Sequence, residues 1–223
     1  GRGGEWAGEG ERGMRGGRKG ACKGKTEREE GGGQSKERAE GGRDQGNSEM
    51  VLTDNSPRLT IAHGLWPERL RDQLRVVARL NEKAAASAAS GDAEPFRILT
   101  GIECDILEDG SLDQEPELLA ELDLVVASVH SKLRMPSDEM TPRMVEAISN
   151  PHPDFLGHCT GRSVRGKGRP PSEFGAEVVF AAGAPAAVGV ATNSGPVRRA
   201  PPPALRRRAL PPGGHRARAR ASR

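Results

Sequence analysis

The feature that most constrains the fold is a set of three apolar runs, each ending in a residue that can bind a metal ion. They read FRILTGIE, ending at Glu103, DLVVASVH, ending at His130, and PDFLGH, ending at His158. The second run is almost continuously apolar, which is typical of a strand buried on both faces of a parallel sheet. The third is short and is the weakest candidate for a strand.

Segments with helical character alternate with these runs. An amphipathic helix is predicted from Pro67, because apolar residues recur there at helical spacing, at Leu70, Leu74, Val77 and Leu80. A short helix is expected from about Glu115 to Leu122. A third should be capped by Ser137, and a fourth should stop at Gly183, before a possible strand in AAVGVATN. Strands alternating with helices over short connections predict a parallel α/β fold, either a barrel or a doubly wound sheet.

Glu103, His130 and His158 should therefore meet at one edge of the sheet, where the carboxyl ends of parallel strands carry ligands and chemistry. Two imidazoles and one carboxylate suit zinc, manganese or iron. A single histidine at a strand end is more often a hydrogen-bonded turn residue, so the residues alone leave both interpretations open. Cys104 should point away from Glu103 into the core, and Cys159 is interpreted as a small, half-buried residue.

The two ends of the chain differ sharply from its middle. Residues 1–50 contain 16 glycines and residues 195–223 contain 9 arginines and no acid, whereas residues 51–194 carry a net charge of −7. We expect both end segments to be disordered, because they offer little apolar surface to offset the entropy of ordering. The chain has no signal-peptide-like or membrane-spanning apolar run, which predicts a cytoplasmic protein. Its 3 cysteines lack metal-cluster spacing.

Four motifs, in order, resemble the polymerase and histidinol phosphatase (PHP) family, as in family X DNA polymerases and stand-alone PHP proteins. They are LTDNSPRLTIAHGL, ILTGIECDILEDGSLD, LVVASVHSKLRM and FLGHCTGR. Over residues 51–194 the resemblance implies a partial copy of a distorted (β/α)7 barrel that hydrolyses phosphoesters with divalent metals. It implies that Glu103, His130 and His158 bind metal, and that Lys132 and Arg162 contact the phosphate of the substrate. No catalytic acid or base is assigned.

The chain departs from the family pattern at the other metal ligands. The H-x-H and D-x-H motifs are absent from this sequence, and Asn55 stands where the T-D-H-S motif of the family has a histidine. The resemblance therefore implies one metal site, for Zn²⁺ or Mn²⁺, and impaired hydrolysis of a phosphorylated small molecule or a nucleic-acid end. The alternative is an inactive fragment, or a module that binds nucleic acid nonspecifically through the arginine-rich tail, residues 195–223.

Overall fold

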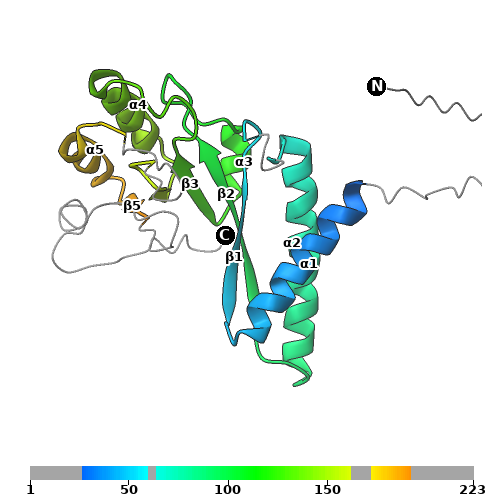
Figure 1. Cartoon of the computed structure of the whole chain (residues 1–223). Helices are drawn as coiled ribbons and strands as arrows, with labels where there is room; N and C mark the ends of the chain where they lie inside the picture. Colours follow the sequence, from blue (N-terminus) through cyan, green and yellow to red (C-terminus); the bar gives the residue numbers. More distant parts are fainter. Residues whose placement is uncertain (1–26, 60–63, 162–171, 192–223) are drawn as a thin grey trace, which may run out of the picture.

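The structure, a computed structural model, describes residues 27–59, 64–161 and 172–191 (Figure 1). In chain order the elements are α1 (Glu27–Asp44), β1 (Glu49–Asn55), α2 (Pro67–Ala89), β2 (Arg97–Asp105), α3 (Pro116–Ala120), β3 (Leu124–Ser128), α4 (Ser137–Ser149), β4 (Phe155–Leu156), α5 (Ala176–Gly183) and β5 (Gly189–Val190). The predicted α/β class is confirmed.

The strands form one parallel sheet in the order β1-β2-β3-β4-β5, so each strand pairs with the next one along the chain. A doubly wound sheet reverses its strand order at a switch point. The described strands contain no such reversal. Of the two architectures that the sequence left open, the sequential order therefore favours the barrel type.

The helices pack on one face of the sheet, and alternate residues of the strands point to that face. On β2, Ile102 and Cys104 are fully buried in a cluster with α2 and α3, and β3 contributes Val125 to the same cluster. A second cluster joins Ala127 and the β4 residue Leu156 to α4 and α5. Because side chains alternate along a strand, Glu103 points to the opposite face. The prediction that Cys104 points away from Glu103 is confirmed.

Most of the predicted elements are present, with one correction at a helix start. Ser137 does not cap α4 but is its first residue, and no side chain makes a capping hydrogen bond there. Pro136 occupies the cap position because its extended backbone lets its carbonyl accept hydrogen bonds from the amides of Glu139 and Met140, at 3.1 and 2.8 Å. The short helix α3 and the weak strand β4 are both present, and α5 ends at Gly183 as predicted.

Part of the segment expected to be disordered is ordered. Within residues 1–50, α1 forms at Glu27–Asp44 and lies along α2 (Figure 1). Tertiary contacts outweigh the poor helix propensity of its glycines: Ala39 is buried in a cluster with Leu52 and Val77, and Arg38 pairs with Asp54 at 2.7 Å. The expected disorder is therefore wrong for residues 27–44. Residues 1–26 and 195–223 lie outside the described residues, and the division of the chain into segments stays a prediction.

None of the helices in the described ranges combines the length and apolarity needed to cross a membrane.

Candidate metal centre

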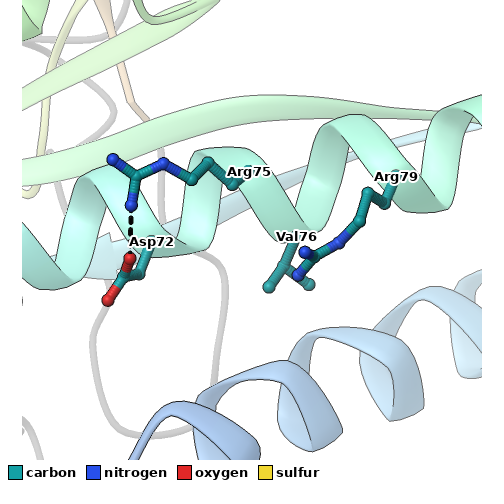
Figure 2. A pocket seen from close by; sticks show the side chains of 4 residues that line it. All are labelled: Asp72, Arg75, Val76 and Arg79. Carbon is teal, nitrogen blue, oxygen red and sulfur yellow. Dashed lines mark hydrogen bonds and ion pairs between the residues drawn. The ribbon is translucent and has the colours of Figure 1, made fainter.

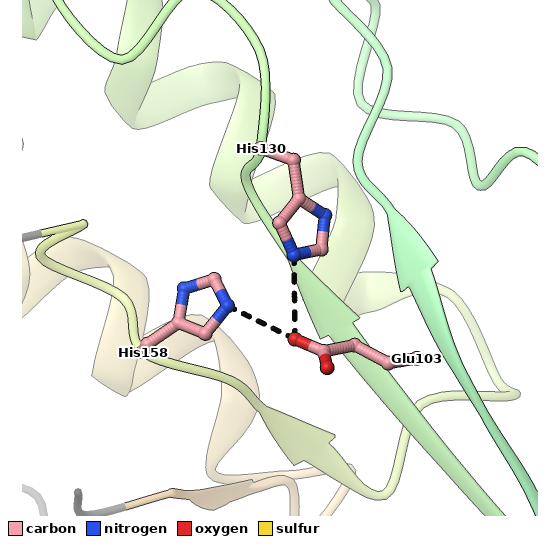
Figure 3. A group of neighbouring side chains, drawn as sticks. All are labelled: Glu103, His130 and His158. Atoms are coloured by element: carbon pink, nitrogen blue, oxygen red, sulfur yellow. Dashed lines mark ion pairs between the residues drawn. The ribbon is translucent and has the colours of Figure 1, made fainter. Parts of the chain in front are cut away.

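Three side chains converge where β2, β3 and β4 end. Glu103 is the third-last residue of β2, and His130 and His158 each follow their strand by two residues. Nε2 of His158 lies 2.9 Å from Oε1 of Glu103, and Nε2 of His130 lies 3.4 Å from the same oxygen (Figure 3). One donor atom from each residue lies within 4.8 Å of the other two. The predicted convergence of these three residues is therefore present.

The convergent atoms form a donor set that suits a divalent cation. The two imidazoles are close to buried, with 12 and 13% of their side-chain surface exposed, and Glu103 is 29% exposed. The rings meet edge to face, with centroids 5.0 Å apart. Each ring aims Nε2 at the carboxylate, as two neutral imidazoles and one anion would surround a metal ion. The residues fit a metal, and these three form a group that could hold one.

The sequence-based prediction missed Ser128, which orients Glu103. This fully buried residue of β3 donates a hydrogen bond from Oγ to Oε1 of Glu103 at 2.8 Å. The signal lay in the alternation of the strand, since Ser128 and His130 are two residues apart and face the same way. Metal-ligating carboxylates are commonly held by such hydrogen bonds.

The sequence-based prediction also missed the buried carboxylate of Asp105. This residue follows Glu103 by two positions on β2, which places both on one face of the sheet. Its Oδ1 accepts a hydrogen bond from the backbone amide of His130 at 2.9 Å. Alternation along β2 was again the signal that could have found it.

The site is strongly polarised without a metal. Burial alone lowers the pKa of His130, but Asp105 and Glu103 outweigh it and raise that pKa to about 9. Hydrogen bonds from His130 and His158 hold the pKa of Glu103 well below its ordinary value, against the opposing effect of burial. The metal-free site therefore holds a protonated His130 beside an ionised Glu103 at neutral pH, and a metal ion must displace that proton.

Four other residues were singled out from the sequence, and none of them is in the group formed by Glu103, His130 and His158. Asn55 lies opposite Glu103 in the β1–β2 register, so it occupies the same face of the sheet beside the site. Lys132 pairs with Glu108 at 2.5 Å on the protein surface. Arg162 lies outside the described residues. Cys159 is buried and not half-buried as expected, because it packs in the core cluster with α4 and α5, and this burial raises the pKa of its thiol to about 11, so the thiol is neutral.

A second feature of the surface is a pocket on α2, lined by Asp72, Arg75, Val76 and Arg79 and facing α1 (Figure 2). Arg75 pairs there with Asp72 at 2.6 Å. None of the three metal-binding candidates lines this pocket, which is therefore separate from the site.

Comparison with known proteins finds relatives that match about half of the chain or less. No family model matches it. It is 41% identical over 115 residues to the DNA polymerase/3′-5′ exonuclease PolX of Bacillus subtilis, a match that covers 52% of this chain and 19% of that protein. It is 34% identical over 113 residues to a probable phosphatase of Thermoanaerobacter pseudethanolicus, covering 49% of this chain and 40% of that protein.

A probable phosphatase of Caldanaerobacter subterraneus subsp. tengcongensis is 38% identical over 69 residues, covering 29% of this chain and 27% of that protein. The chain thus spans between about a fifth and two fifths of the length of these curated relatives. Over about half of its own length, the chain is homologous to PolX and to probable phosphatases, which confirms the resemblance inferred from the four motifs.

Proposed function

We propose that this chain binds one divalent cation, Zn²⁺ or Mn²⁺, through Glu103, His130 and His158, and that the site hydrolyses phosphoesters with impaired efficiency. The observation that carries the proposal is the approach of two Nε2 atoms to one carboxylate oxygen from three separate strand ends. The homology to a 3′-5′ exonuclease and to probable phosphatases supports it, because both names describe cleavage of a phosphoester bond.

The residues of the chain would divide the work as follows. A bound divalent cation would supply Lewis acidity toward a phosphoryl oxygen. Glu103 supplies the negative charge that retains the cation, and Ser128 fixes the direction of that carboxylate through its 2.8 Å hydrogen bond. The two imidazoles complete the donor set, and packing of the helices on the far face of the sheet keeps the strand ends in register.

Two positively charged side chains, those of Lys132 and Arg162, are proposed to contact the phosphate of the substrate. Lys132 is exposed and follows His130 by two residues, so it could exchange Glu108 for a phosphate oxygen. Arg162 follows His158 by four residues, within the FLGHCTGR motif. Each of these two side chains would make a charge-assisted hydrogen bond to a phosphate oxygen.

The substrate is proposed to be a phosphorylated small molecule or the 3′ end of a nucleic acid. We expect turnover to be weak, because Asn55 offers an amide beside Glu103 where the family pattern has an imidazole. One cation can stabilise only part of the charge that develops when a phosphoester is cleaved.

The test is an assay with p-nitrophenyl phosphate and with a 5′-labelled oligonucleotide, each with added Mn²⁺ or Zn²⁺. Any turnover should depend on the added metal and should disappear in His130→Ala and in His158→Ala. His152→Ala is the matched control, because His152 precedes β4 and so lies at the opposite end of that strand from His158. Robust turnover that survives both substitutions at the site would contradict the proposal.

A further inference from the structure

The imidazole of His130 lies between two carboxylates. Its Nε2 faces Oε1 of Glu103 at 3.4 Å, and its Nδ1 faces Oδ1 of Asp105 at 3.6 Å. Nδ1 is buried and makes no hydrogen bond to any residue that the structure describes. Hydrogen bonds at functional sites are often long in the unliganded state and tighten when the site is filled. Asp105 is the carboxylate that Nδ1 of this ring faces.

Metal binding through Nε2 requires a particular tautomer of the ring. The imidazole must be neutral, with its proton on Nδ1, so that Nε2 offers a lone pair. A carboxylate that faces Nδ1 stabilises that tautomer, fixes the ring and raises its basicity as a ligand. His158 differs in this respect, because no described carboxylate lies within ion-pair distance of its Nδ1, which also has no described hydrogen-bond partner.

Asp105 is itself held rigidly, as a residue that orients another must be. It is only 3% exposed, and its backbone amide donates to Oγ of Ser56 at 3.0 Å and to Oδ1 of Asp113 at 2.9 Å. The hydroxyl of Ser131 lies 3.4 Å from its Oδ2 and accepts a hydrogen bond from Nη2 of Arg143 at 3.2 Å. These hydrogen bonds connect Asp105 to the buried guanidinium group of Arg143 on α4.

We propose that Asp105 is the positioning residue of His130, which keeps the ring proton on Nδ1 and holds Nε2 toward Glu103 and the cation. This inference rests on the proposed metal site. It assigns no contact with the substrate to Asp105.

The test compares Asp105→Asn with Asp123→Asn. An asparagine at position 105 keeps a carbonyl that can accept from the backbone amide of His130, and it removes the charge facing Nδ1. Asp123 undergoes the same chemical change just before β3 begins, where it accepts hydrogen bonds from Thr100 at 2.8 and 2.9 Å. The control thus tests loss of a hydrogen-bonded carboxylate at the opposite end of the strand.

The first measurement is the tautomer of His130 in the metal-free chain, from nitrogen chemical shifts recorded at a pH at which they show the ring to be neutral. The wild-type ring should carry its proton on Nδ1, and the proton should move to Nε2 in Asp105→Asn. The tautomer of His158 should be the same in both proteins. The second measurement is zinc affinity, which should fall about 10- to 100-fold in Asp105→Asn and stay unchanged in Asp123→Asn.

Each result decides one of the two claims. An unchanged tautomer together with unchanged zinc affinity in Asp105→Asn would overturn the role of Asp105 and leave the metal site standing. A wild-type chain that binds no zinc would contradict the proposed function, and the tautomer would still decide the role of Asp105. If Asp105→Asn does not fold, the wild-type spectrum alone decides, because a proton found on Nε2 of His130 overturns the inference.

Discussion

Gly157 lies against Ser128 so closely that a Cβ atom on Gly157 would stand 2.1 Å from Oγ of that serine. The same Oγ donates the hydrogen bond that orients Glu103. The glycine that precedes His158 is therefore needed for the close approach of β4 to the hydroxyl that supports the site.

We expect Gly157→Ala to lower the free energy of unfolding by about 1–3 kcal/mol, because the methyl group overpacks a buried contact. It should also weaken zinc binding, since Ser128 must turn away from Glu103. Urea unfolding and a zinc titration measure the two effects. Gly41→Ala is the control, because no atom outside the neighbouring backbone of α1 lies within 4 Å of a Cβ there and α1 should gain about 0.5–1 kcal/mol. Equal behaviour of the two variants would contradict the packing argument.

The metal-free chain should lose stability as the pH rises through 9. The pKa of His130 is raised from 6.5 to about 9 in the folded chain. Its contribution to stability is therefore complete below pH 6.5 and is lost as the pH rises through about 9. The urea midpoint of the metal-free wild-type protein should fall across this window, and the midpoint of the His130→Asn variant should fall much less. Parallel curves for the two proteins would show that His130 is not the group responsible.

Zinc affinity should change with pH in the opposite direction. Because zinc displaces the proton of His130, affinity should rise with pH until about 9, by up to tenfold per pH unit. Titration calorimetry in buffers of different ionisation enthalpy measures the proton released for each zinc bound. Binding without proton release at neutral pH would mean that His130 is not a ligand.

Asn55→His should not restore efficient turnover. The substitution places an imidazole opposite Glu103 on the neighbouring strand, but a second cation would need further ligands that the described residues do not bring together there. The p-nitrophenyl phosphate assay with added Mn²⁺ should give the wild-type rate within a factor of about ten, less than 1.4 kcal/mol in the barrier. A much larger gain would show that Asn55 alone limits the site.

Much of the sheet and of the site could be predicted from local sequence. The apolar runs around Ile102 and Val125 have the composition of strands, and their sequential order places Glu103, His130 and His158 at one edge. Helix α2 was predictable because Leu70 and Val77 repeat at helical spacing.

The remainder depends on contacts between residues far apart in the chain. Helix α1 has the composition of a disordered segment, and it is ordered by packing of Ala39 against α2 and β1. The roles of Ser128 and Asp105 depend on which face of a strand each occupies and on the distance to a partner on the next strand. Residue types alone do not give that register.

Zinc stoichiometry of the purified chain tests the central claim most directly. After loading and dialysis, elemental analysis should find one zinc ion per wild-type chain and per His152→Ala control, because one set of three donors converges in the described residues. The double variant His130→Ala/His158→Ala should retain none, since it leaves only the carboxylate of Glu103. A double variant that still holds one zinc ion per chain would show that the metal binds elsewhere and would contradict the assignment of the site.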